Sequence, residues 1–281
     1  MSIKEIIRIS RPRFWLYEAA TFGLVGAVAG AENTLFLSTP HFWIFFFYFL
    51  IPANILIYGI NDIFDYETDK FNQKKTEYEG LLPPHRRRAV WLWIIGSTLP
   101  FLFFVPITAP LLLSFGAFLF FAVFYSAPPI RAKALPLFDS LFSAAHYVAT
   151  GVFGYYLVGG THFPLIGVIA GMLWAVAMHA YSAVPDITAD AKAGLQTIAI
   201  LVGKHKTILV CWFLYLLAGF VAKELLPFST LIGGVVYSYL MWRSLKATTE
   251  AELFRLYTYF PTVNTLVGAS VSLELIAQLV F

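Results

Sequence analysis

The stretch HFWIFFFYFLIPANILIYGI, residues 41–60, is followed directly by NDIFDYETDK, residues 61–70. The first stretch holds twenty residues without Asp, Glu, Lys or Arg, which is about the length that an α-helix needs to cross a bilayer. The second stretch places three Asp and one Glu within nine positions. Carboxylates near hydrocarbon are costly, so the pattern predicts a partner that offsets their charge.

The composition extends this contrast to the whole chain. Of 281 residues, 59% are hydrophobic and 12% are charged, whereas an ordinary soluble domain is about one quarter charged. The mean hydropathy of +0.74 therefore indicates an integral membrane protein. The single cysteine, Cys211, excludes an intrachain disulfide and a cysteine-only metal site. The first fifteen residues do not fit a signal peptide, because arginines interrupt their apolar stretch, and we expect an amphipathic interfacial segment there.

Apolar segments long enough to cross a membrane recur along the chain and predict an all-α, polytopic fold of about nine transmembrane helices. The connections between them alternate between short ones and longer polar ones, the longer being 61–88, 126–136, 185–206 and 246–258. We expect a single transmembrane domain over residues 1–281. The expected spans are 14–31, 41–60, 89–106, 109–125, 137–158, 163–184, 207–223, 228–245 and 259–280.

The basic residues orient these spans. With the boundaries above, 18 of the 19 Lys and Arg residues fall on one side of the membrane, and only Lys223 falls on the other. Cytoplasmic loops are enriched in Lys and Arg. The distribution therefore predicts a cytoplasmic N-terminus, an external C-terminus and a cytoplasmic position for the acidic stretch.

The acidic stretch has a helical spacing. Asn61, Asp65 and Asp69 lie four residues apart, and Asp62 falls on the same face of a helix. Like charges at this spacing destabilise a helix by a few tenths of a kcal/mol. A hard divalent cation would offset the charge, since Mg²⁺ typically takes one or two carboxylates together with substrate phosphates.

A second acidic segment, VPDITADAKAG at residues 184–194, closes the sixth span on the same side of the membrane. Asp186 and Asp190 repeat the four-residue spacing, four spans after the first cluster. The arrangement suggests a weak internal repeat of four helices. Two such clusters facing each other across a pocket would hold two or more Mg²⁺ ions and, through them, a diphosphate. The alternative, two solvated acidic helix ends, explains neither the matching spacing nor the matching position.

Basic residues stand close to these clusters. The loop FYSAPPIRAKALP, residues 124–136, carries Arg131 and Lys133 at the cytoplasmic end of the fourth span, and its paired prolines predict an extended backbone. Arg131, Lys133 and the N-terminal Arg11 are candidates for direct contact with a phosphate. Their alternative role is that of ordinary cytoplasmic-side residues.

The chain resembles the UbiA superfamily of intramembrane prenyltransferases. NDIFDYETD after the second span is similar to the NDxxDxxxD motif of that family, and YSAVPDITADAKAG after the sixth is similar to its DxxxD motif. The resemblance runs from about Ile3 to the C-terminus, and it is the pair of motifs that makes it specific. The residues that carry it are Asn61, Asp62, Asp65, Asp69, Asp186 and Asp190.

This resemblance implies Mg²⁺-dependent transfer of a prenyl group from an isoprenyl diphosphate to a hydrophobic acceptor drawn from the bilayer. It implies a central cavity open to the cytoplasmic side, membrane lipid as surroundings and no nucleic-acid partner. Both acidic motifs would bind Mg²⁺ and diphosphate. The second motif, Val184-Pro185-Asp186, is leaner than in members that act on hydroxybenzoates and naphthoates. SRPRFW near the start and the lean second motif look more like the branch that prenylates carotenoids, the lycopene elongases, or tetrapyrroles.

The chemistry implied is ionisation of an allylic diphosphate, followed by attack of the acceptor's π electrons. Aromatic faces stabilise a cation by about 0.5–2 kcal/mol each, and the chain is 18% aromatic. Because Tyr66, Tyr125 and Tyr181 stand beside the motifs, we expect them to line the pocket.

Other polar residues inside spans have less specific readings. Glu18 and Glu274 are intramembrane acids and are functional candidates by default, although Glu18 lies near enough to the boundary to reach water and Glu274 is expected to pair with Gln278 or a neighbouring helix. We expect His146 and His179 to be core histidines. Asp139 is expected to cap the helix of the fifth span.

Two other protein classes fit part of the pattern. A secondary transporter also has paired acidic sites and internal repeats, but its sites lie at mid-membrane, and cation-coupled flux in proteoliposomes without prenyl transfer would identify it. A CDP-alcohol phosphotransferase would pack glycines among its aspartates within one segment, which this chain does not do. Within the prenyltransferase interpretation, a quinone, another aromatic or a tetrapyrrole remains an alternative acceptor.

Overall fold

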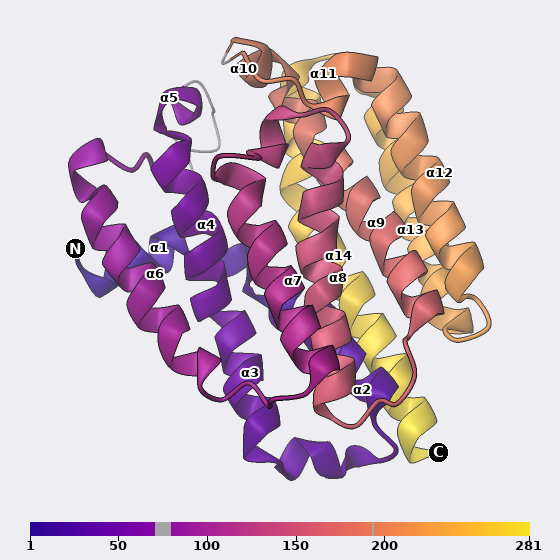
Figure 1. Ribbon diagram of the computed structural model, residues 1–281. Coiled ribbons are helices and arrows are strands. Elements are labelled where there is room, and N and C mark those ends of the chain that lie inside the picture. The colour runs from indigo at the N-terminus through magenta and orange to yellow at the C-terminus, as the bar shows by residue number, and fades with distance from the viewer. Residues whose placement is uncertain (71–79, 193) are drawn as a thin grey trace.

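The computed structural model describes residues 1–70, 80–192 and 194–281, so part of the 61–88 connection lies outside it. Within the described residues all regular secondary structure is helical, which confirms the all-α prediction. The long helices run alongside one another, with α5, α10 and α11 at one end of the molecule and the C-terminus at the other (Figure 1).

The long helices follow the expected spans closely. They are α3 (Pro40–Leu50), α4 (Pro52–Phe64), α6 (Arg87–Leu102), α7 (Ala109–Ser126), α8 (Phe138–Leu157), α9 (Leu165–Ala183), α12 (Lys204–Ala222), α13 (Pro227–Lys246) and α14 (Glu250–Val280). The shorter α-helices are α1 (Ile3–Ile9), α2 (Val25–Gly30), α5 (Tyr66–Asp69), α10 (Ile187–Lys192) and α11 (Ile198–Val202). The first expected span consists of a π-helix, η2 (Tyr17–Leu24), that continues into α2, and 3₁₀ turns occur at η1 (Pro12–Phe14), η3 (Thr34–Ser38), η5 (Pro84–Arg86), η6 (Ala132–Ala134) and η7 (Val184–Asp186).

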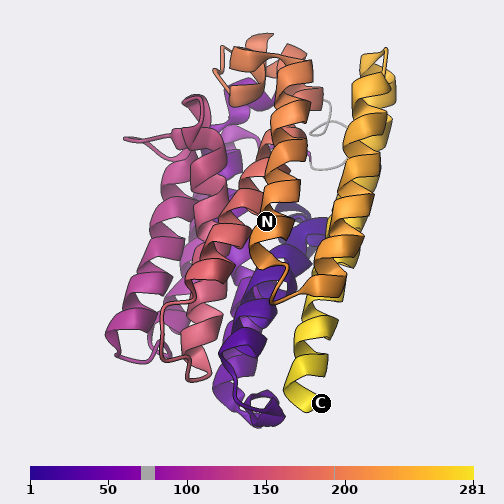
Figure 2. The same ribbon diagram turned by 90° about the vertical axis from the view of Figure 1, so that its right-hand side faces the viewer.

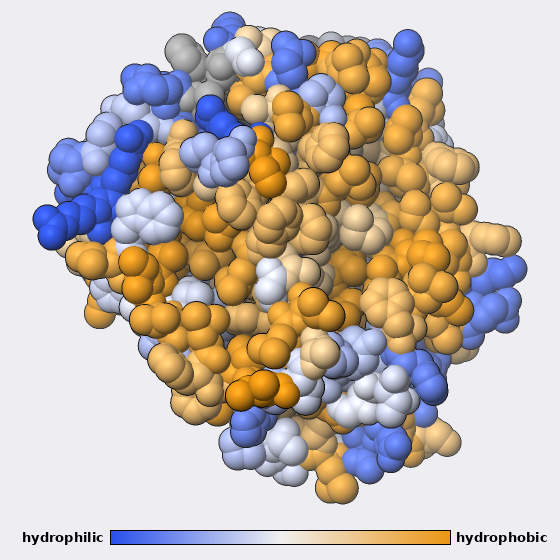
Figure 3. Space-filling model, viewed as in Figure 1, coloured by the Kyte–Doolittle hydropathy of each residue, from blue (hydrophilic) through white to orange (hydrophobic). Residues whose placement is uncertain are grey.

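Helices of sufficient length and apolarity to cross a membrane are present in the described residues. Within the described residues there are five of them: Pro40–Phe64, Ala109–Ser126, Leu165–Lys192, Lys204–Ala222 and Glu250–Val280. The remaining expected spans coincide with η2–α2, α6, α8 and α13. Hydrophobic residues dominate the surface shown in Figure 3, and hydrophilic residues gather mainly toward its upper left and lower edges.

The helices differ from the expected ranges at two instructive points. α14 begins nine residues earlier than expected, because the Thr249 side chain caps it by accepting a hydrogen bond from the Glu252 backbone N–H at 3.1 Å. The second span is interrupted at Ile51 (φ −122°, ψ −61°), directly before Pro52. Proline removes a backbone donor and disfavours helical backbone in the preceding residue, so α3 and α4 meet there as two helices.

Glycines hold the first span against α8. A Cβ at Gly26 would lie 1.9 Å from the Gly151 carbonyl oxygen, and one at Gly30 would lie 2.3 Å from that of Tyr155. Only glycine permits this approach of two backbones, a common device in membrane helix packing. α14 packs on the other side of η2 and α2, so the first and last spans are neighbours (Figures 1 and 2).

The N-terminal α1 is amphipathic, as expected. Ser2 and Glu5 form a capping box, and Ile6 and Ile9 are buried. Hydrogen bonds from the Ser2 backbone and the Arg86 guanidinium lower the pKa of Glu5. The Arg86 contact joins α1 to η5, α1 packs beside α4, and Arg11 follows near the end of that helix.

The apolar core has two main parts. One lies among α3, α4, α6, α7 and α8 and includes the edge-to-face pair Phe45 and Phe153. The other lies among α8, α9, α12, α13 and α14 and includes the stacked rings of Tyr215 and Tyr237. A polar cavity lies where elements of both parts meet.

Candidate active site

The first acidic segment is not one continuous helix. α4 ends at Phe64, Asp65 follows with non-helical backbone (φ −110°, ψ 7°), and α5 begins at Tyr66. The expected unbroken stripe from Asn61 to Asp69 is therefore wrong. The break turns the Asp65 side chain inward, where it is 0% exposed and meets cations from another part of the chain.

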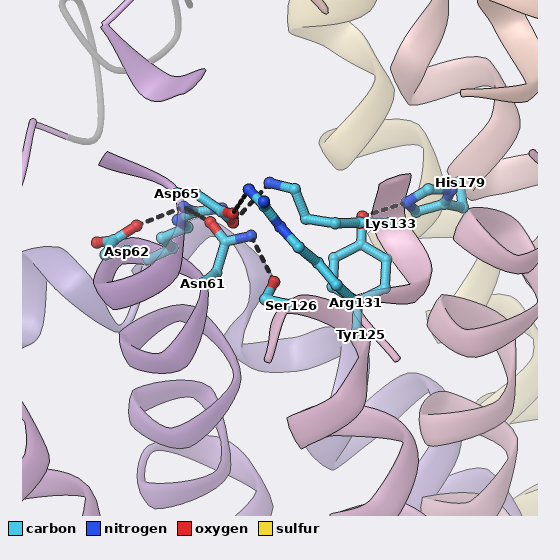
Figure 4. Close-up of polar contacts among 9 residues, drawn as sticks. Asn61, Asp62, Asp65, Tyr125, Ser126, Arg131, Lys133 and His179 are labelled. Atoms are coloured by element: carbon cyan, nitrogen blue, oxygen red, sulfur yellow. Dashed lines mark hydrogen bonds and ion pairs between the residues drawn. The ribbon is translucent and has the colours of Figure 1, made fainter. Parts of the chain in front are cut away.

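Three basic residues bind these acids. The Arg11 Nη2 atom lies 3.0 Å from Asp62 Oδ1 and donates to Asn61 Oδ1 at 3.2 Å. Arg131 Nη2 lies 3.3 Å from Asp65 Oδ1, and Lys133 Nζ lies 2.5 Å from Asp65 Oδ2. Figure 4 shows Arg131 and Lys133 converging on Asp65. The sequence places these cations in two separate segments, the N-terminal one and the 124–136 loop, and the fold brings them to one carboxylate cluster.

Both of these arginines have an uncommon backbone conformation. Arg11 has φ 50° and Arg131 has φ 46°, both in the left-handed region, which residues with a Cβ adopt at a cost. Strained backbone of this kind clusters at ligand clamps and active sites. Arg11 also lies over the Tyr58 ring, with its guanidinium carbon 4.3 Å from the ring centroid, so the side chain is held on two sides.

The two acidic segments line the same cavity, which has a volume of about 220 Å³. The first contributes Asn61 and Asp69, and the second contributes Asp186 and Asp190. Asp62 and Asp65 hold Arg11 and Lys133, which line the cavity themselves. Of the residues predicted from sequence, those in the lining are Arg11, Asn61, Asp69, Tyr125, Lys133, Asp186 and Asp190.

Two predicted aromatic residues lie elsewhere. Tyr181 is fully buried, its hydroxyl shares a 2.7 Å hydrogen bond with Ser244, and its ring meets Phe260 edge-on at 4.8 Å. Tyr66 lies on α5 with Lys70 Nζ 4.8 Å above its ring. Neither side chain lines the cavity formed by the described residues, because proximity to a motif in sequence does not fix which way a helix faces.

The histidines are not ordinary core residues, contrary to the expectation. His179 and His146 both line the cavity. His179 Nε2 lies 2.8 Å from the Tyr125 hydroxyl (Figure 4), and its Nδ1 lies 3.2 Å from Ser140 Oγ. Spacing carried a usable signal, since His179 lies seven residues before Asp186, two helical turns along the same face.

Two acids in the spans accept hydrogen bonds from the backbone of other helices: the partner of Asp139 differs from the expected one, whereas Glu274 meets a neighbouring helix, as expected. Asp139 is fully buried and accepts a hydrogen bond from the Ile198 backbone N–H at 3.1 Å. It therefore caps α11, which follows the second acidic segment, rather than its own helix. Glu274 accepts from the backbone N–H groups of Phe228 (3.0 Å) and Ser229 (2.7 Å) and so caps α13.

The carboxylate oxygens around the cavity are ligands of the kind that Mg²⁺ prefers. In residues 1–70, 80–192 and 194–281, no three His, Cys, Asp or Glu side chains converge as a ready-made metal centre. The carboxylates are instead divided between two walls of one cavity. Mg²⁺ typically takes one or two carboxylates, several waters and substrate phosphates rather than an all-protein cage, so this division suits an ion that is completed by a phosphate ligand.

A second cavity of about 230 Å³ lies among η2, α2, α8, α9 and α12 to α14, and its lining is almost entirely apolar. A buried hydrogen-bonded layer stands between it and the first. Trp174 Nε1 donates to Tyr237 (2.9 Å), Tyr237 donates to Asn264 (2.8 Å), and Asn264 donates to Tyr17 (3.0 Å). Tyr17 lines the first cavity, whereas Trp174 and Tyr237 line the second.

Sequence relatives span almost the whole chain. The lycopene elongase/hydratase of Halobacterium salinarum is 39% identical over 268 residues, covering 92% of this chain and 92% of that protein. The protein of the same name from Corynebacterium glutamicum is 33% identical, covering 98% of this chain and 97% of its own length. A digeranylgeranylglyceryl phosphate synthase of Thermococcus gammatolerans is 30% identical, covering 76% of this chain and 74% of that protein.

Solved structures share the fold at low sequence identity. A UbiA homologue from Archaeoglobus fulgidus bound to GPP and Mg²⁺ superposes with a TM-score of 0.70 at 19% identity, covering 97% of this chain and 99% of that chain. The apo structure of a UbiA homologue from Aeropyrum pernix K1 gives 0.74 at 17% identity, covering 96% and 99%. The sequence profile of the UbiA prenyltransferase family matches residues 19–266. The paired acidic segments, the shared helical fold and this match agree, and the chain belongs to the UbiA prenyltransferase family.

Proposed function

We propose that the protein transfers a prenyl group from an isoprenyl diphosphate to a carotenoid acceptor in the membrane, with lycopene as the leading candidate. The observation that carries this proposal is the meeting of both acidic segments and their basic partners in one cavity. The acceptor is suggested by relatives named lycopene elongase/hydratase at 33–39% identity over nearly the full chain. A quinone, another aromatic or a tetrapyrrole is the alternative acceptor.

The basic residues would bind the diphosphate. Arg11 and Lys133 line the cavity, and Arg131 shares the Asp65 carboxylate with Lys133. Charge-assisted hydrogen bonds from arginine to phosphate are among the strongest in proteins. In a site that excludes water, these donors would stabilise the charge that develops on the leaving diphosphate.

The carboxylates that line the cavity, Asp69, Asp186 and Asp190, would hold Mg²⁺ together with Asp62 and Asp65 of the first motif. Mg²⁺ bound there would neutralise charge on the leaving diphosphate as a Lewis acid. The capping of α11 by Asp139 would keep the second acidic segment in position, because it fixes the chain shortly after Asp190.

The aromatic lining would keep the allylic cation from water. Phe14, Tyr58, Tyr147 and Phe260 line the cavity along with Tyr125. Ring faces attract a cation more strongly where water is excluded, at about 2 kcal/mol or more. We therefore assign to this lining the role expected from sequence for Tyr66 and Tyr181.

The second cavity offers a place for the remainder of a long acceptor. Its lining is apolar and rich in glycine, including Gly171, Gly219 and Gly233, so it could take a chain that has no polar group. A polyene would reach the first cavity with its end double bond and leave its length in hydrocarbon-like surroundings. A polyene that extends from the second cavity into the first would have to pass the hydrogen-bonded Trp174–Tyr237–Asn264–Tyr17 chain.

We further propose nine membrane crossings by η2–α2, α3–α4, α6, α7, α8, α9, α12, α13 and α14, acting as one transmembrane domain over residues 1–281. The segregation of 18 of the 19 basic residues supports a cytoplasmic N-terminus, an external C-terminus and an active-site cavity open to the cytoplasmic side of the cell membrane.

The decisive experiment is expression in cells that make lycopene, followed by extraction and mass analysis of the pigments. Carotenoids lengthened by one or more isoprene units would establish the acceptor. Unchanged pigment, with prenyl transfer to a quinone or tetrapyrrole in the same membranes, would establish the alternative. Cation-coupled flux without any prenyl transfer would identify a transporter instead.

A further inference from the structure

A buried acid–base pair adjoins the active-site cavity, outside the roles assigned above. Glu18 belongs to the π-helix η2 and is 1% exposed, and His146 belongs to α8 and is 3% exposed. His146 Nδ1 lies 2.6 Å from Glu18 Oε1, and the Thr150 hydroxyl donates to Glu18 Oε2 at 2.7 Å. The two partners are 128 residues apart in sequence.

The location of the pair favours a functional role. Ionisable groups inside membrane spans are costly and mark functional sites by default, and replacing a buried ion pair by apolar residues is often neutral or stabilising. Glu18 also lies in a π-helix, a rare geometry that is found often at functional sites. A purely structural link between the first span and α8 is already supplied by the contacts of Gly26 and Gly30 of α2.

The pair is oriented toward the cavity. Because Nδ1 meets the Glu18 carboxylate, Nε2 is the ring nitrogen that is left to reach a bound molecule, and His146 is the member of the pair that lines the cavity. A carboxylate on one imidazole nitrogen sets the tautomer and raises the basicity of the other. Glu18 is thus a positioning residue for a base at His146 Nε2.

The depth of His146 also fits. It lies seven residues after Asp139 on α8, which is roughly 10 Å along the helix axis. Asp139 itself contacts the start of α11, shortly after the second acidic segment. The Ser143 side chain lines the cavity between them. His146 therefore faces the part of the cavity that an acceptor entering from the membrane would reach, beyond the diphosphate-binding cations.

Resting on the proposed prenyl transfer, we propose that His146 is the catalytic base that ends the reaction. The carbon–oxygen bond of the donor breaks, and its electron pair leaves with the diphosphate. The acceptor's double bond supplies the electron pair of the new carbon–carbon bond, which leaves a carbocation on the acceptor. His146 Nε2 takes a proton from the adjacent carbon, and the electron pair of that C–H bond forms the new double bond. The proton remains on the imidazolium beside the Glu18 carboxylate until the product leaves.

The test uses the full-length enzyme in membranes with dimethylallyl diphosphate and lycopene, and measures separately the diphosphate release and the elongated pigment that carries the new double bond. His146→Gln should lower elongated pigment by about 100-fold or more, the usual contribution of a general base. It should lower diphosphate release far less, with a hydroxylated elongated product replacing the pigment that ends in a new double bond, because water captures the carbocation left on the acceptor. Glu18→Gln, which keeps the size of the side chain, should produce the same separation of the two readouts. His205→Gln, an exposed histidine at the start of α12, is the matched control and should change neither.

The results distinguish a wrong base assignment from a wrong proposed function. If His146→Gln and Glu18→Gln retain elongated pigment near the wild-type level, or lose both readouts in parallel while the protein stays folded, the base assignment is overturned. If His146→Gln does not fold, Glu18→Gln decides alone by the same criteria. If the wild-type protein itself releases no diphosphate and elongates no pigment, the proposed function has failed, and not this inference alone.

Discussion

Replacing Arg131 by glycine should separate catalysis from folding. Arg131 has left-handed backbone at φ 46°, and relief of that strain is worth roughly 1–2 kcal/mol. Glycine lowers the free energy of unfolding by about 0.5–1 kcal/mol, because it loses more conformational freedom on folding than other residues do. The ion pair with Asp65 contributes at most about 1 kcal/mol, since the Arg131 side chain is 40% exposed. The free energy of unfolding should therefore change by between about −1 and +1.5 kcal/mol.

Activity should respond much more strongly. A hydrogen bond from a charged donor is worth about 1.5–3 kcal/mol, and each 1.36 kcal/mol of transition-state stabilisation corresponds to about tenfold in rate. Arg131→Gly should therefore lower diphosphate release by about 10- to 150-fold. The assay is diphosphate release in membranes, paired with thermal unfolding of the purified protein in detergent.

Leu137→Gly is the matched control, because Leu137 shares the left-handed backbone (φ 71°) and carries no charge. It should leave the rate unchanged while shifting the unfolding temperature only slightly. Arg131→Lys should keep the strain and part of the rate. A rate for Arg131→Gly within twofold of wild type would refute the assignment of Arg131 to the diphosphate, and a large loss of stability would refute the strain argument.

Three further outcomes follow from the structure. Asp186→Ala should lower diphosphate release by at least about 100-fold with little change in unfolding temperature, because the half-buried carboxylate faces the cavity. Full activity would show that Asp186 does not bind the metal. Gly233→Leu should lower elongation of lycopene by roughly tenfold. A Cβ at Gly233 fits at 3.6 Å from a neighbouring side chain, and the longer leucine side chain would fill the second cavity. The control Gly116→Leu, on an open helix face, should leave elongation unchanged. Gly26→Ala should destabilise the protein by about 1–3 kcal/mol or more through overpacking. Gly116→Ala should be neutral or slightly stabilising. Thermal unfolding in detergent measures both effects.

Much of the helix pattern was predictable, because hydrophobic length is a strong signal in membrane proteins. The predicted 109–125 span coincides with α7 (Ala109–Ser126) to within one residue. The breaks were harder to predict. Pro52 could have marked the division of the second span, since proline restricts the residue before it, but the interruption at Asp65 depends on a buried carboxylate turning toward Arg131 and Lys133.

The candidate site was predictable in its residue types and only partly in its geometry. Spacing identified the two acidic segments, and the structure brings them to one cavity. The rotation of α9 decides that His179 faces this cavity and that Tyr181 does not. Nearness to the motif does not reveal this difference, and only the seven-residue spacing of His179 from Asp186 indicates it. The contact of Glu18 with His146 joins residues 128 positions apart, so no local pattern could have indicated it.

The ion pairs at the first acidic segment have a consequence for turnover. Asp62 and Asp65 already occupy the guanidinium and ammonium groups that a diphosphate would seek. Incoming phosphate oxygens would compete with these carboxylates for the same cations, and the carboxylates would compete with the diphosphate once the prenyl group has gone. Competition from these carboxylates would weaken product inhibition. The enzyme would therefore bind its substrate less tightly and release diphosphate faster.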